Sequence, residues 1–155
     1  MKNILIATIA TCTALIAHSA DRLEAPAILD CPNELASVRN IVEPLRDSTR
    51  TYGNGSTRIL HLDTGGEPAC CSSYLAILAP DPKSELGDRQ CKVLASNAHG
   101  LGFMSISMLD VSSAYDSTKG LLLTIPVKLY KDGITSVTTY IKVRVNQSSG
   151  DVVLE

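Results

Sequence analysis

Apolar and polar residues alternate most regularly near the end of the chain, where they predict a long β-hairpin. Residues 121–129 and 137–145 each place an apolar residue at almost every second position, which is typical of strands with one buried face. Lys131-Asp132-Gly133 between them has the composition of a turn. The sequence therefore predicts two antiparallel strands joined by a tight loop.

The register of this hairpin follows from the rule that directly opposed residues share a face of the sheet. A two-residue loop would set Val127 opposite Thr138 and place a core position against a solvent position. A three-residue loop with Gly133 in the left-handed conformation pairs Val127 with Val137 instead, and we expect that register. Pro126 falls on the more exposed face, and its missing N–H predicts a free edge or a bulge there.

Shorter extended segments are expected before the hairpin. Residues 58–63 alternate, residues 73–79 are apolar and fit either a strand or a helical turn, and residues 91–96 and 103–111 are further strand candidates. Within the last of these segments the apolar face changes near Met108, which predicts a bulge.

An amphipathic helix is predicted ahead of these strands. Apolar residues recur at helical spacing over Glu34–Arg46, at positions Leu35, Val38, Ile41, Val42 and Leu45. Pro32 suits the first turn of such a helix, whereas Pro44 weakens or ends it. Residues 47–57 are polar and contain two glycines, and they are expected to form a loop.

Together these elements predict an α+β domain. One N-terminal amphipathic helix packs on an antiparallel sheet of about four to six strands, which ends in the long hairpin. The order of elements loosely resembles that of cystatin-like rolls, in which a sheet wraps around an N-terminal helix. The resemblance concerns the architecture alone and implies no activity.

Residues 1–19 have the features of a cleavable signal peptide. Lys2 precedes an apolar run over residues 4–16, and the small residues Ala17 and Ser19 stand before the expected cleavage point. A retained membrane helix needs about 20 predominantly apolar residues, and this run is shorter and interrupted by threonines. A lipid anchor on Cys12 is the other alternative. We expect a single domain over residues 20–155, exported to the periplasm or secreted, with no stable membrane span after cleavage.

Cysteine usage agrees with export. The chain has five cysteines, and loss of the signal peptide would leave Cys31, Cys70, Cys71 and Cys91. An even set in an exported chain predicts two disulfides, and the missing Cys-x-x-Cys spacing disfavours a metal or redox site. Neighbouring side chains of a strand point to opposite faces. We therefore expect Cys31 and Cys91 to bond separately to the adjacent pair, in preference to a bond within that pair.

Charge and aromatic content bound the class of partner. Without Lys2, thirteen basic residues stand against sixteen acidic residues, which gives a net charge near −3. This balance disfavours nonspecific nucleic-acid binding, which needs a concentrated positive field. Tryptophan is absent and only one phenylalanine is present, so stacking on bases or sugars would depend on five tyrosines. No nucleic-acid partner is expected.

Candidate chemical groups are few. His61 and Asp63 share one strand face, and with His99 they have the composition of a two-histidine, one-carboxylate metal site. A polar strand face with an unrelated loop histidine explains the same residues more simply. No nucleophile elbow and no His-Glu-x-x-His motif occurs. We predict no catalytic residue and no cofactor, and favour a non-catalytic protein over an enzyme.

The outward side of the hairpin is the one candidate binding surface. It combines tyrosine with basic residues, and we call the following five the hairpin face: Lys128, Tyr130, Tyr140, Lys142 and Arg144. Tyrosine and arginine are enriched in interface hot spots, and basic residues on an acidic chain suit an acidic partner. A solvated sheet face of the same composition is the alternative.

Three functions are compatible with these observations. The first is a small exported binding protein without catalytic activity, such as an inhibitor or immunity-type partner of another secreted or periplasmic protein. The second is an exported hydrolytic or metal-dependent enzyme that uses His61, Asp63 and His99. The third is a structural subunit of an envelope or secretion assembly that pairs through an exposed strand edge.

Overall fold

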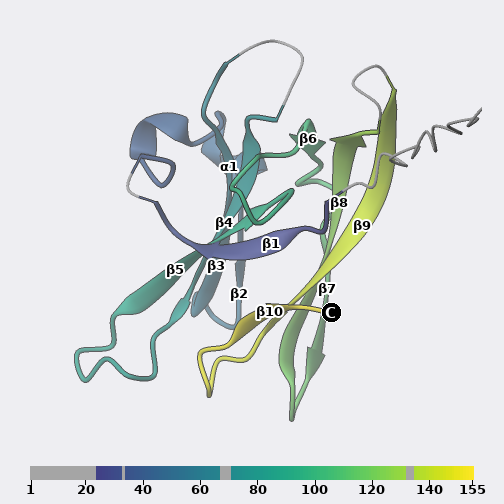
Figure 1. Cartoon of the computed structure of the whole chain (residues 1–155). Coiled ribbons are helices and arrows are strands. Elements are labelled where there is room, and N and C mark those ends of the chain that lie inside the picture. Colours follow the sequence, from purple (N-terminus) through teal and green to yellow (C-terminus); the bar gives the residue numbers. More distant parts are fainter. Residues whose placement is uncertain (1–23, 33, 67–70, 132–134) are drawn as a thin grey trace, which may run out of the picture.

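A computed structural model describes residues 24–32, 34–66, 71–131 and 135–155 and contains two antiparallel sheets (Figure 1). The first, sheet A, has the strand order β1 (Ala27–Asp30), β5 (Arg89–Ala95), β4 (Ser73–Pro80), β3 (Thr57–Asp63) and β2 (Thr49–Tyr52). The second, sheet B, has the order β10 (Val152–Leu154), β9 (Ser136–Val145), β8 (Gly120–Tyr130) and β6 (Ser105–Ile106), and β7 (Ser112–Asp116) also pairs with β8. Within the described residues, the helical elements are a 3₁₀ turn over Val38–Asn40 and α1 (Leu45–Ser48), a helix of one turn.

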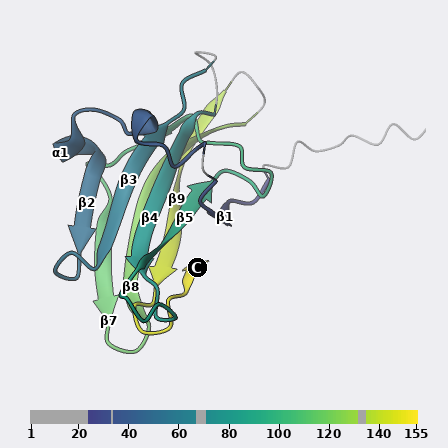
Figure 2. The ribbon, with the colours of Figure 1, turned by 90° about the vertical axis from the view of Figure 1, so that its left-hand side faces the viewer.

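The two sheets face each other and enclose the main core (Figure 2). Sheet A contributes Ile59, Leu75 and Ile77, and sheet B contributes the inward residues of β8 and β9, which include Leu123 and Val143. All five side chains are fully buried. The inward residues of β8 and β9 fall at every second position, so the alternation in the sequence corresponds to a sheet with one face on the core.

A second, smaller cluster covers the other face of sheet A. The segment after β1 has to reach β2 at the opposite edge of that sheet, and it crosses the outer face on the way. Leu35 and Ile41 of this segment pack against buried Leu62, Val93 and Ala95. Because both faces of β4 are covered, its apolar residues form a continuous run with no alternation. The sequence of this segment, residues 73–79, fitted either a strand or a helical turn for that reason.

The expected amphipathic helix over Glu34–Arg46 is wrong. The chain is extended at Ile41, which forms a bridge with Leu62 of β3, and Val38 and Leu45 are 83% and 52% exposed. Three of the five apolar residues in the pattern are β-branched, which lowers helix propensity. The side-chain amide of buried Asn40 donates to the carbonyl oxygens of Glu34 and Leu35, at 2.9 and 3.0 Å, and this holds a loop in place of a helix.

The fold class therefore changes from α+β to a two-sheet, mostly β architecture. The expected single sheet of about four to six strands on a helix is replaced by two five-stranded sheets packed on each other. Pro44 precedes a helical turn, where a proline is tolerated, and does not end a helix. Residues 47–57, expected to be a loop, contain β2 and its turn into β3. The resemblance to cystatin-like rolls depended on the N-terminal helix, so it is wrong as well.

The long hairpin is present, in a register two residues from the expected one. Val127 lies opposite Thr139, and Leu129 lies opposite Val137. The Lys131 N–H donates to the Thr135 carbonyl at 2.9 Å, so the pairing extends to Lys131, the first residue of the expected Lys131-Asp132-Gly133 turn. A shift of two residues leaves every side chain on its face, so the argument from shared faces could not separate the two registers. Asp132 and Gly133 lie outside the described residues.

Pro126 lies on the outer face of sheet B, opposite exposed Tyr140, but its own side chain is buried there. Its carbonyl accepts from the Ser107 N–H at 3.0 Å, on the side of β8 where β6 ends and β7 has not yet begun. The missing N–H of the proline therefore falls in an interruption of the neighbouring strand. The expected bulge near Met108 is this interruption, where residues 107–111 loop out between β6 and β7.

Residues 103–106 connect the two sheets. Phe103 pairs with Ser73 of β4 through two backbone hydrogen bonds, and the next N–H, of Met104, donates to the Lys128 carbonyl of β8. Gly102 lies directly before this crossing, where an added Cβ would stand 2.3 Å from the Cys71 carbonyl oxygen. Only a glycine fits that approach of two backbones.

A disulfide joins Cys31 to Cys91, next to the β1–β5 ladder. This bond rules out the preferred pairing, in which each of these two cysteines bonded to the adjacent pair. Cys71 is also disulfide-bonded, and Cys70 lies outside the described residues. The expected pairing failed because β1 and β5 are neighbours, a fact of topology that the cysteine spacing does not contain.

Two further expectations fall on residues that are not described. The signal peptide over residues 1–19 and the alternative lipid anchor on Cys12 both lie before residue 24. Within the described ranges, no helix has the length and apolar character needed to cross a bilayer.

Candidate functional site

The hairpin face lies on the outer side of sheet B, on β8 and β9, the two longest of the described strands. The inward residues of β8 and β9 are in the core, so the alternate residues Lys128, Tyr140 and Lys142 point outward and are exposed. Tyr140 is 67% exposed and stands opposite Pro126. Tyr130 is half-buried near the end of the ladder. The strand period therefore places a tyrosine between two lysines on a rigid surface.

Arg144, the fifth residue of the hairpin face, already has a partner. Its Nε and Nη2 donate to Oε1 and Oε2 of Glu155 at 2.8 and 2.9 Å, and Nη1 donates to the Gly120 carbonyl at 3.2 Å. Only 13% of its side chain is exposed. The hydrogen bond from Arg144 lowers the pKa of the Glu155 carboxyl, and the charges of Lys119 and Lys142 lower it further. Arg144 thus ties β9 to the C-terminal strand, a role that the sequence did not suggest.

An apolar groove that the sequence analysis missed lies at the edge of β9. Its volume is about 450 Å³, and the apolar part of its lining includes Pro26, Leu129, Val137, Ile141 and Leu154. Three charged residues, Glu24, Lys142 and Glu155, also line it. We call it the β9 groove. It exists because β10 pairs only with Val143–Val145 and leaves the rest of β9 without a neighbour on that side among the described strands.

His61 lies on the inner side of β3, at a small pocket of about 240 Å³ that Ile106, Met108 and Pro44 also line. Its Nε2 atom is buried and has no hydrogen-bond partner among the described residues. Burial lowers the pKa of the imidazole from 6.5, and the charge of Asp63 opposes this in part. The neutral ring is therefore the form that suits the native packing.

The depressed pKa of His61 predicts that stability falls on acidification. Above pH 6.5 the imidazole is neutral in both the folded and the unfolded chain, so its protonation costs the folded state no stability. As the pH falls below 6.5 toward the lower native pKa, the unfolded chain binds a proton that the native chain resists, so stability is lost. We expect His61→Leu, measured by urea unfolding, to lose less stability than the wild type across this window. Equal losses in both proteins would contradict the prediction.

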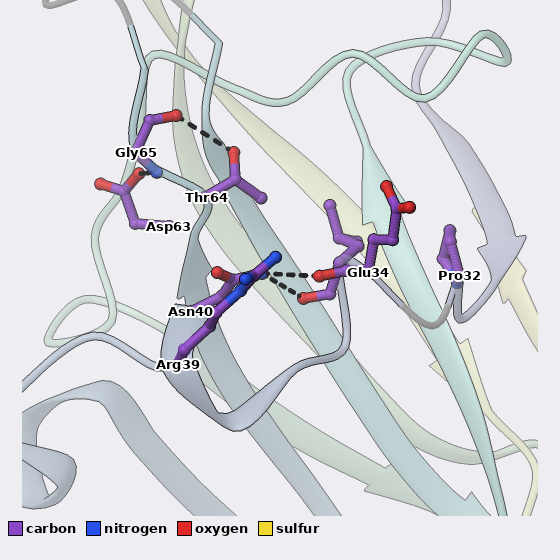
Figure 3. A pocket seen from close by; sticks show the side chains of 8 residues that line it. Pro32, Glu34, Arg39, Asn40, Asp63, Thr64 and Gly65 are labelled. Carbon is purple, nitrogen blue, oxygen red and sulfur yellow. Dashed lines mark hydrogen bonds between the residues drawn. The ribbon is translucent and has the colours of Figure 1, made fainter.

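Asp63 lies at a different pocket from His61, and Figure 3 shows the pocket of Asp63. This pocket, of about 690 Å³, lies between the segment after β1 and the end of β3, and Glu34 and Arg39 also line it. Its polar groups mostly stabilise loops, since the Asp63 carboxylate accepts from the Gly65 N–H at 2.9 Å. His99 is exposed in the loop after β5. In the part of the chain that is described, no group of three histidine, cysteine or acidic side chains is placed to hold a metal ion.

No family model, no curated protein and no solved structure matches this chain. The functional reading of the molecule therefore depends on its own geometry.

Proposed function

We propose that the chain is a small exported binding protein without catalytic activity, which holds a protein partner on the hairpin face. The observation that carries this proposal is the exposed Tyr140 between Lys128 and Lys142, on a hairpin whose two strands pair over ten successive positions. Tyrosine offers a large, rigid contact area at low entropic cost, which is why it recurs at interface hot spots.

Charge supports a partner with an acidic patch. Lys128 and Lys142 form no ion pair among the described residues, while the chain as a whole has more acidic than basic residues. An acidic partner would be steered toward this face and would neutralise both lysines. Such a partner fits an inhibitor or immunity-type role toward another secreted or periplasmic protein.

Export is supported by two independent features. Residues 1–19 have the pattern of a signal peptide, and the Cys31–Cys91 disulfide is of the kind that persists in oxidising compartments. The periplasm and the outside of the cell are both compatible with these features.

Substitution of Tyr140 and Lys142 together by alanine is expected to weaken partner binding by about 30-fold, since hot-spot truncations cost about 2 kcal/mol or more. The measurement is affinity capture from the exported fraction of the native host, followed by titration of the captured protein. Arg58→Ala is the matched control, because Arg58 is an exposed strand residue on sheet A. Arg144 is left intact because it holds the C-terminal strand.

Undiminished capture by the double variant would overturn the hairpin-face proposal. Large self-associated or envelope-bound complexes in the same experiment would instead support the structural-subunit alternative. A stoichiometric metal in the purified protein that is lost in His61→Ala would support the enzyme alternative.

A further inference from the structure

One edge of sheet B carries backbone groups that no described residue satisfies. The Glu155 N–H donates to the Lys142 carbonyl at 3.0 Å, so even-numbered residues of β9 turn their backbone groups away from β8. By this alternation the N–H and C=O groups of Ser136, Thr138 and Tyr140 point outward. No described strand pairs with the backbone groups of these three residues, which precede Lys142 in β9. We call these outward groups the β9 edge.

The β9 edge lacks the features that usually keep strand edges from pairing. Proteins protect exposed edges with lysine, proline, bulges or very short strands. Residues 135–141 contain no charged residue, no proline and no glycine, and all of them except Ser136 are threonine, valine, isoleucine or tyrosine. The edge strands of sheet A, in contrast, are four residues each, and β2 carries Arg50. The β9 edge is thus well suited to receive another strand.

The β9 groove lies beside this edge, on the inner side of the sheet. Val137 and Leu154 are 36% and 38% exposed there, and Leu129 is half-buried. A strand paired with the β9 edge would send every second side chain into this groove. Apolar side chains at those positions would bury the exposed carbons of Val137 and Leu154.

The charges select the occupant. Lys142 lies on β9, the edge strand, and Lys128 lies one strand further in, on β8 opposite Thr138. The other side chains of an added strand would project onto the outer face that carries both lysines. A second copy of the chain would bring its own two lysines to the same face, which like-charge repulsion disfavours. A segment with acidic residues at alternate positions would instead meet both lysines with opposite charge.

We propose that the β9 edge binds an extended segment of a protein partner by strand addition, with apolar residues facing the β9 groove and acidic residues on the outer face that carries Lys128 and Lys142. Backbone hydrogen bonds to Ser136, Thr138 and Tyr140 supply the pairing, and the alternating side chains supply the selectivity. The inference rests on the proposed function, because it names the chemistry of the segment that contacts the hairpin face.

The test uses a capped, fluorescein-labelled peptide of about eight residues, in which valine and glutamate alternate. A second peptide has lysine in place of every glutamate. By fluorescence anisotropy, the acidic peptide is expected to bind the full mature chain at least about 10-fold more tightly than the basic one. Amide resonances of residues 136–141 in the wild type should shift on binding. Equal affinity for both peptides, or shifts confined to another edge such as β7, would overturn the inference.

Thr138→Pro separates edge pairing from general adhesion. The Thr138 N–H points away from β8, so proline there removes an outward donor and leaves the ladder with β8 intact. We expect this variant to bind the acidic peptide about 10-fold more weakly and Thr138→Val, which keeps the N–H, to bind within about 2-fold of wild type. Wild-type affinity in a folded Thr138→Pro protein would contradict strand addition. The resonance shifts of the wild type decide the question if the proline variant does not fold.

Failure of this inference can be told apart from failure of the proposed function. A captured partner that is lost with Tyr140→Ala and Lys142→Ala but retained by Thr138→Pro would overturn strand addition alone. Peptide binding at the edge without any captured partner would count against the proposed function alone. If the wild type sediments as a dimer that Thr138→Pro dissociates, and the peptide does not bind, the occupant is a second copy and the inference is wrong.

Discussion

Replacement of Cys31 and Cys91 together by alanine is expected to lower the free energy of unfolding by about 4 kcal/mol. The two cysteines are 60 residues apart, and in the chain-entropy model a cross-link across a loop of that length removes about 4 kcal/mol of unfolded-state freedom. Domains of this size are stable by about 5 to 15 kcal/mol in total, so the loss would be a large share. Urea unfolding at equilibrium measures it directly.

The double variant is a sharper test than addition of a reductant. Cys71 is disulfide-bonded as well, so a reductant would break more than the bond in question. The Cys31–Cys91 bond follows β1, an edge strand of four residues whose last residue, Asp30, pairs with Lys92. A loss below about 1 kcal/mol would mean that the β1–β5 ladder already fixes the ends of this loop without the cross-link.

The strands of the core could be predicted from the sequence wherever one face meets solvent. Residues 121–129 and 137–145 show their alternation because the polar residues of β8 and β9 point out of sheet B. In β4 both faces are covered, so the sequence shows a continuous apolar run whose element type pattern alone cannot decide. Short edge strands such as β1 and β10 contain too few residues to show any period.

The helix was wrongly predicted because two different burial patterns give the same spacing. Leu35 and Ile41 are apolar since they cover the outer face of sheet A, whereas Val38 and Leu45 are exposed. The sequence provides the spacing but not the sheet that this segment has to cross. The propensities of Val38, Ile41 and Val42 favoured an extended chain, and here local preference was a better guide than period.

The sequence predicted which side chains share the outer face of the hairpin, but not which of them bond to other parts of the chain. Alternation alone placed Tyr140 and Lys142 on one outward face, as the register requires. The hydrogen bonds from Arg144 to Glu155 depend on β10, which was not predicted. The β9 edge depends on the residue at which β10 stops, and sequence can supply only a hint of it in the uncharged residues 135–141.

The strongest single-residue test of the two-sheet core is Phe103→Ala, for which we expect a loss of about 3 to 5 kcal/mol in the free energy of unfolding. Phe103 is fully buried, and it is the largest of the fully buried side chains. Its backbone pairs with Ser73 in sheet A, while the next residue pairs with Lys128 in sheet B. Truncation therefore leaves a cavity at the point where the chain joins the two sheets.

Two controls separate the cavity from other effects. Phe103→Leu keeps an apolar side chain in the site. We expect its loss in the free energy of unfolding to be smaller than that of Phe103→Ala by about 1 to 2 kcal/mol. Leu101→Ala alters the same loop at a position that is 48% exposed, and it should change stability by no more than about 0.5 kcal/mol. If Phe103→Ala were as mild as Leu101→Ala, the two sheets would not share one core at this crossing. A shared core predicts that both sheets unfold together in a single transition, and that expectation would then be wrong.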